Sequence, residues 1–136
     1  PKSTGRELFG EPFFKKVLGD IGKFSAFDVL ATFTEFTARS LAMNYKLHFG
    51  SAPDKIILTG GGAANFVLVK AIQKNIAAAF GKEIKIVTSN EIGWPVQAIE
   101  PAAFALLAWL RFEKRTGNLL ETTGAKRAVL CGQISE

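Results

Sequence analysis

Cysteine and histidine each occur once in the 136 residues, and the chain has no long apolar run. The single Cys131 excludes an internal disulfide and is typical of a reducing compartment, so we expect a cytoplasmic location. His48 has no companion for a histidine–cysteine metal cluster, and we interpret it as a solvated residue near a helix end. Because a membrane-spanning helix needs about 20 consecutive apolar residues, no span is expected.

The excess of positive over negative charge in the chain is also small. Seventeen basic residues face twelve acidic ones, a net charge of +5, and the basic residues are scattered in runs of no more than two. The phenylalanines mostly lie within apolar patterns, which indicates core positions rather than platforms for stacking bases. We therefore expect no nucleic-acid partner. Hydrophobic residues make up 48% of the chain and charged residues 21%, values typical of a globular protein with a core.

Glycine, in contrast, is concentrated where it is most informative. The apolar run Ile56-Ile57-Leu58 is followed by Thr59 and then by Gly60-Gly61-Gly62-Ala63-Ala64-Asn65. The pattern predicts a buried strand, a glycine turn and a helix that begins near Asn65. Glycines permit positive φ and bring ligands close to the backbone, whose amides can cradle phosphate or ribose oxygens. The turn matches neither of the common phosphate-binding loops, so a purely structural turn is an open alternative.

The rest of the chain divides into a few expected elements. Apolar residues recur at three- and four-residue steps over residues 26–48, which predicts a long helix capped by Ser25 and packed on more than one side. Further expected elements are strands at residues 55–59 and 83–88, helices at 65–80 and 101–115, a helix-ending Gly81 and a loop at 89–96. Residues 1–7 and 9–14 are interpreted as loop with a short turn.

This order of elements predicts an α/β fold. Strands that alternate with helices through short links favour parallel strands joined by a right-handed crossover. Two parallel strands do not form a stable sheet alone, because such sheets need helices over both faces and further strands. Residues 1–136 are therefore interpreted as a single unit, a fragment of a larger α/β protein.

Two further stretches contain candidate functional residues. Glu100 precedes Pro101, a residue tolerated in a first helical turn, so the carboxylate is expected at a helix N-terminus. It would either complete a helix cap or contact sugar hydroxyls or a magnesium-bound water. Residues 122–127 form a polar glycine loop before an apolar segment, for which a closing hairpin or an edge strand is the structural alternative.

Taken in order, these motifs resemble the anhydro-N-acetylmuramic acid kinase family and the related levoglucosan kinase. The resemblance covers essentially the whole chain and rests on four stretches in sequence. They are Pro1-Lys2-Ser3-Thr4-Gly5-Arg6-Glu7, Gly60-Gly61-Gly62-Ala63-x-Asn65, Gly93-x-Pro95-x-x-x-x-Glu100-x-x-Ala103-Phe104-Ala105, and Thr123-Gly124-Ala125.

The resemblance implies the C-terminal half of an actin-like ATPase fold, in which two RNase H-like domains close around ATP. It implies phosphorylation of a 1,6-anhydro sugar by ATP and Mg²⁺ with opening of the anhydro bridge by water, as in cell-wall (peptidoglycan) recycling. The catalytic aspartate and the N-terminal domain would lie outside this chain, and a homodimer of longer chains is implied. Gly60, Gly61, Gly62 and Asn65 would lie at the nucleotide, and Glu100 would contact sugar or metal-bound water.

Two positions depart from the family pattern. Gln97 stands where an aspartate is usual, and Pro101 stands where an alanine is usual, so substrate choice or activity is open to change. The alternatives are a kinase for levoglucosan or another sugar of the same superfamily, and an inactive α/β interaction domain whose glycine turn is structural.

Overall fold

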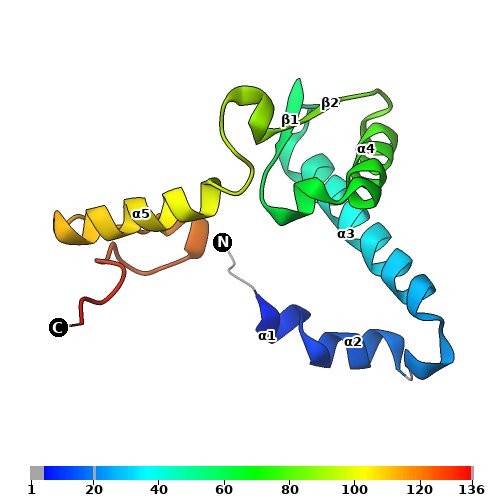
Figure 1. Cartoon of the computed structure of the whole chain (residues 1–136), viewed down its shortest axis with the longest axis horizontal. Coiled ribbons are helices and arrows are strands. Elements are labelled where there is room, and N and C mark those ends of the chain that lie inside the picture. Colours follow the sequence, from blue (N-terminus) through cyan, green and yellow to red (C-terminus); the bar gives the residue numbers. More distant parts are fainter. Residues whose placement is uncertain (1–4, 20, 136) are drawn as a thin grey trace. The chain divides into compact units, whose positions relative to one another are not determined.

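The computed structural model describes residues 5–19 and 21–135, and the stretch Pro1–Thr4 of the first motif lies outside them. The chain divides into two compact groups, one formed by Phe24–Glu100 and the other by Pro1–Lys23 with Pro101–Glu136, and each is described by itself. The first group contains helix α3 (Ala26–Phe49), strand β1 (Lys55–Leu58), the 3₁₀ helix η2 (Gly61–Ala64), helix α4 (Phe66–Phe80), strand β2 (Lys85–Thr88) and the 3₁₀ helix η3 (Ser89–Ile92) (Figure 1).

The predicted long helix is confirmed as α3. The Ser25 hydroxyl accepts a hydrogen bond from the Asp28 amide, and Gly50 ends the helix at φ 63°. Ala38 and Ala42 are buried where α4 packs, since small side chains let two helix backbones approach closely. Packing of α3 on more than one side, which Phe33 and Phe36 suggested, stays a prediction. Along the main predicted face, α4 does not cover the N-terminal end, where Phe27 is 83% exposed.

The two predicted strands form a parallel pair, with Ile56 opposite Ile86 in register. Ile56 is buried in a core with Ile72 and Ile76 of α4, and Ile86 packs against it. Both helices therefore cover the sheet face that carries Ile56. Because side chains alternate along a strand, Ile57 points to the opposite face, where it is 43% exposed.

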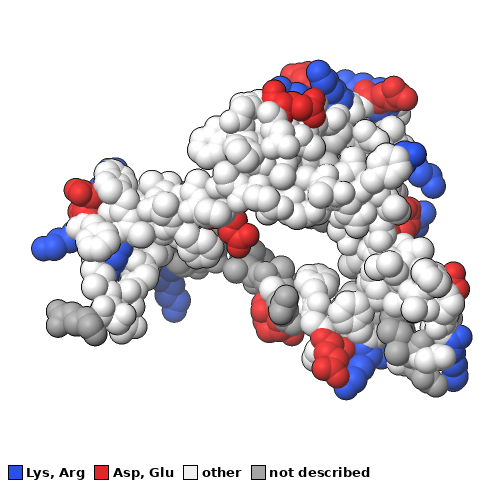
Figure 2. All heavy atoms as spheres, viewed as in Figure 1, with Lys and Arg blue, Asp and Glu red and all other residues white. Residues whose placement is uncertain are grey.

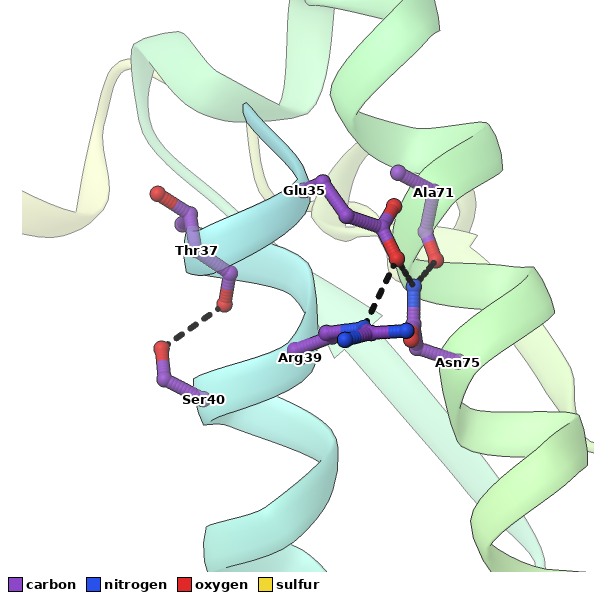
Figure 3. A network of polar contacts seen from close by, with 6 residues as sticks. All are labelled: Glu35, Thr37, Arg39, Ser40, Ala71 and Asn75. Carbon is purple, nitrogen blue, oxygen red and sulfur yellow. Dashed lines mark hydrogen bonds and ion pairs between the residues drawn. The ribbon is translucent and has the colours of Figure 1, made fainter. Parts of the chain in front are cut away.

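A polar link joins the two helices beside this core (Figure 3). Oε1 of Glu35 on α3 accepts hydrogen bonds from Arg39 Nε at 3.1 Å and from Asn75 Nδ2 of α4 at 3.2 Å. Asn75 Nδ2 also donates to the Ala71 carbonyl oxygen at 2.9 Å. The link fixes the register of α4 against α3, which apolar contacts alone specify less sharply.

The second group corrects the sequence-based prediction. Helices α1 (Arg6–Phe9) and α2 (Glu11–Leu18) overlap residues 1–7 and 9–14, which were predicted to form loop and turn. The 3₁₀ turn η1 (Ile21–Lys23) follows them. Gly10 is the N-cap of α2, and Pro12 lies in its first turn. A proline there removes an N–H that has no partner within the helix, so it is compatible with helix formation.

Helix α5 (Ile99–Phe112) begins two residues before the predicted start and ends three before the predicted end. After α5, the Asn118 side chain connects two stretches of the C-terminal segment. Its Oδ1 accepts a hydrogen bond from the Val129 amide at 2.8 Å, and its Nδ2 donates to the Arg127 carbonyl at 3.0 Å. The glycine loop 122–127 contains the end of the one-turn helix α6 (Leu120–Thr123), which Gly124 ends at φ 70°. No strand follows β2 in the described residues, so the hairpin or edge-strand alternative is wrong. None of the described helices is long and apolar enough to cross a membrane.

Candidate functional site

The glycine turn follows β1 and leads into α4. Gly60 adopts φ 77° and ψ −178°, a conformation that only glycine adopts readily, and Gly61 begins the short helix η2. A Cβ atom on Gly61 would meet nothing within 4 Å, whereas one on Gly62 would touch Leu68 Cδ2 at 3.6 Å. Of the three glycines of this turn, only Gly60 has positive φ. At Gly61 and Gly62 the missing side chain leaves the backbone open to a ligand.

Asn65 has the role that its position predicts. It is the N-cap of α4, and its Oδ1 accepts a hydrogen bond from the Leu68 amide at 3.1 Å. Capping satisfies one of the amide groups that lack a partner in the first turn and so fixes where the helix begins. Asn65 thus holds the start of α4 directly behind the glycine turn.

The segment after β2 is more ordered than the predicted loop. Thr88 and Glu91 form a reciprocal capping box around η3, and Gly93 ends that helix at φ 85°. The Trp94 amide donates to the Ser89 carbonyl at 2.9 Å, and Ser89 is only 2% exposed. These contacts turn the chain back toward the end of β1 before α5 begins.

The glycine turn after β1 and the segment after β2 meet at Val96. Its carbonyl oxygen accepts hydrogen bonds from the Gly60 amide at 2.8 Å and from the Thr59 hydroxyl at 3.1 Å. The Ser89 hydroxyl in turn donates to Thr59 Oγ1 at 3.4 Å. The structure therefore joins the glycine turn to the segment that leads into Glu100, at the carboxyl ends of two adjacent parallel strands. Ligands of open α/β sheets bind at this edge.

Glu100 is exposed and lies in the first turn of α5. Its carboxylate makes no hydrogen bond or ion pair within the part of the chain that the structure describes, so it does not act as a cap there. Gln97 and Pro101, the two departures from the family pattern, are exposed in the same segment. An exposed carboxylate near a helix N-terminus is available to a hydroxyl or to metal-bound water.

Sequence reasoning missed the residues that join the two segments. These are Thr59, Ser89, Asn90 and Val96. Thr59 directly follows β1, and Ser89 and Asn90 directly follow β2. Polar residues at the ends of adjacent parallel strands are a usable signal, because those ends meet at one edge of the sheet.

The described residues contain no group of three histidine, cysteine, aspartate or glutamate side chains that could hold a metal ion. On the face shown in Figure 2, basic and acidic side chains lie near one another rather than in a broad area of one sign. Neither feature assigns a ligand to the glycine turn.

Comparison with known proteins does indicate a family. The family model described as anhydro-N-acetylmuramic acid kinase matches residues 1–136. Among curated relatives, an anhydro-N-acetylmuramic acid kinase of Picosynechococcus sp. is 43% identical over 136 residues, which cover 98% of this chain and 35% of that protein. One from Cyanothece sp. is 40% identical, covering 98% of this chain and 34% of the relative. One from Bacillus cereus is 38% identical, covering 99% and 35%.

The chain spans about one third of the length of these curated relatives. The family model covers residues 1–136, a range that includes the glycine turn, the Val96 segment and Glu100. Because the family model covers the whole sequence, the chain belongs to the anhydro-N-acetylmuramic acid kinase family.

Proposed function

We propose that this chain supplies part of the nucleotide and sugar cleft of an ATP-dependent kinase for 1,6-anhydro-N-acetylmuramic acid. The junction at Val96, which holds the glycine turn beside the segment leading into Glu100, is the observation that carries the proposal. The match of the family model to residues 1–136 supports it. The parallel strands with helices would belong to the C-terminal half of an actin-like ATPase fold, whose further strands and second helical layer would cover the exposed Ile57 face.

The glycine turn would contact the nucleotide. The amides of Gly61 and Gly62 open η2, and first-turn amides have no partner within a helix. With no side chain on either residue, phosphate or ribose oxygens could reach these amides directly. The Gly60 amide donates to Val96 instead, so this glycine would shape the turn rather than bind. Asn65 would act by fixing the start of α4 behind the ligand.

Glu100 would act on the sugar side. Its exposed carboxylate would accept hydrogen bonds from sugar hydroxyls or orient a water bound to Mg²⁺. One carboxylate suits that indirect role, because Mg²⁺ in kinases keeps several waters and binds mainly substrate phosphates. When bound, the ion would neutralise charge on the transferred phosphoryl group.

The proposed reaction transfers the γ-phosphoryl group of ATP to the 6-oxygen of the anhydro sugar. Water adds to the anomeric carbon, and the bond from that carbon to the 6-oxygen breaks. The aspartate that would activate this water is proposed to lie outside the present chain, in the missing N-terminal domain. The complete protein is proposed to work as a homodimer in peptidoglycan recycling.

The test is an assay of the complete gene product with ATP, Mg²⁺ and 1,6-anhydro-N-acetylmuramic acid in water enriched in heavy oxygen. The expected product is the 6-phosphate with one heavy oxygen at the anomeric carbon. Product without the label would contradict hydrolytic ring opening. Turnover of levoglucosan but not of the amino sugar would show that Gln97 and Pro101 accompany a changed substrate. No turnover of either sugar by a folded protein that binds no ATP would favour an interaction domain.

A further inference from the structure

The junction at Val96 depends on two side chains that the proposed chemistry does not use. The Thr59 hydroxyl donates to the Val96 carbonyl oxygen at 3.1 Å, and Asn90 Oδ1 accepts from the Val96 amide at 3.0 Å. The backbone of Val96 is therefore held at its carbonyl by the residue after β1 and at its amide by a residue in the first turn of η3. The Gly60 amide shares the same carbonyl at 2.8 Å.

These bonds connect distant parts of the sequence. Thr59 and Val96 are separated by 37 residues, and the Thr59–Val96 and Gly60–Val96 bonds join the end of β1 to the segment after β2. On one side Val96 leads to Gly60 and the glycine turn. On the other side the Ala98 amide donates to the Pro95 carbonyl at 2.9 Å, and the chain enters α5 one residue later. A shift of Val96 would therefore move the glycine turn relative to Glu100.

Thr59 and Asn90 are both exposed, so their side chains contribute little to the apolar core. The core is formed by α3, α4 and one face of the two strands. Loss of either side-chain bond should therefore leave the core intact and loosen only the junction. Local loosening of this kind is a different outcome from general unfolding.

We propose that Thr59 and Asn90 are positioning residues that set the glycine turn and the Glu100 segment in one fixed arrangement. This inference rests on the proposed function for its kinetic consequence, because the two segments would bind nucleotide and sugar. Neither side chain is required to touch a substrate. Both would act through the backbone of Val96.

The structure allows matched variants at both positions. Thr59→Val removes the hydroxyl and keeps the shape, whereas Thr59→Ser keeps the donor. Asn90→Leu removes the acceptor, whereas Asn90→Asp keeps an oxygen at the same place. Ser40→Ala serves as a control, because it removes a hydroxyl that donates to the Thr37 carbonyl at 3.0 Å on α3, away from the junction (Figure 3).

The experiment measures amide hydrogen exchange and steady-state kinetics in the complete protein. In Thr59→Val and Asn90→Leu, exchange of the hydrogen-bonded amides of Gly60, Trp94, Val96 and Ala98 should rise about 5- to 10-fold, the effect expected when one hydrogen bond is lost. Exchange over residues 68–80 of α4 should not change. The KM values for ATP and for the sugar should both rise by about 5-fold or more, and Thr59→Ser and Asn90→Asp should restore them.

The exchange measurement and the kinetic measurement test this inference and the proposed function separately. Exchange needs no substrate, so absence of kinase activity in the wild-type protein would overturn the function while exchange still decides the positioning role. Unchanged exchange in both Thr59→Val and Asn90→Leu would overturn the positioning role. An equal rise in Ser40→Ala would also overturn it, because the effect would then be general destabilisation. Should Thr59→Val fail to fold, the Asn90 pair decides alone.

Discussion

The glycine turn gives the sharpest single-residue prediction, because its three glycines have different environments. At Gly61 an added side chain meets nothing within 4 Å, and the backbone there does not have positive φ. Gly61→Val should therefore change the free energy of unfolding by no more than about 0.5 kcal/mol, as for an ordinary surface substitution. If a nucleotide lies against this backbone, the same side chain occupies its space, and ATP affinity should fall about 10-fold or more, a loss of about 1.4 kcal/mol.

Two other glycines show why a loss of affinity at Gly61 would be specific. Gly60 lies at φ 77° and ψ −178°, so Gly60→Ala should cost about 1–3 kcal/mol of stability through backbone strain. Gly81 ends α4 in the left-handed region at φ 67°, away from the turn, so Gly81→Ala should cost about 1–2 kcal/mol. Unlike Gly61→Val, this control should leave ATP affinity unchanged.

The assay combines calorimetric titration of the complete protein with a non-hydrolysable ATP analogue and urea unfolding of each variant. The expected pattern is weak binding with normal stability for Gly61→Val and normal binding with lower stability for Gly81→Ala. A folded Gly61→Val protein that binds the nucleotide as tightly as the wild type would refute the reasoning. The turn would then be a structural connection between β1 and α4.

Three further predictions concern the sugar side, the core and the isolated chain. Glu100→Gln keeps the shape of the side chain and removes its charge, so kcat/KM for the anhydro sugar should fall by roughly 100-fold. The melting temperature should change little. Full activity of this variant would remove Glu100 from the proposed site. Ile76→Ala should lower the free energy of unfolding of the complete protein by about 2–5 kcal/mol, because Ile76 is 0% exposed. Ile57→Ala, at a residue 43% exposed, should cost clearly less in the same urea titration. The 136-residue chain alone should not release ADP in a sugar-dependent assay, and such release would contradict the placement of the catalytic aspartate outside it.

Local signals predicted the elements of the first group well. Ser25, Asn65 and Gly81 act at the helix ends where the sequence placed them, because each cap involves residues within about four positions. The same local reasoning failed at α2. There Gly10 and Pro12 suggested a break, although a glycine N-cap and a first-turn proline are both compatible with a helix.

The candidate site was predicted only in pieces. The sequence placed Gly60 after a strand, which is confirmed, and Glu100 at or just before a helix start, where α5 in fact begins one residue earlier, at Ile99. Whether either residue binds a ligand is still a prediction. The family resemblance that the motif order suggested is confirmed by the match over residues 1–136.

By itself, the sequence determined helices α3 and α4, the two strands and the glycine turn, since periodicity, caps and turn residues act over a few positions. Only the tertiary structure decided that the glycine turn and the Glu100 segment are joined by hydrogen bonds to the backbone of Val96. Val96 is an apolar residue without a motif, and its partner Thr59 lies 37 positions away. Its role depends on its backbone carbonyl and amide, groups that every non-proline residue carries and that no sequence pattern distinguishes. Parallel pairing of β1 with β2 brings those groups to Gly60, so the arrangement of the site follows from the fold.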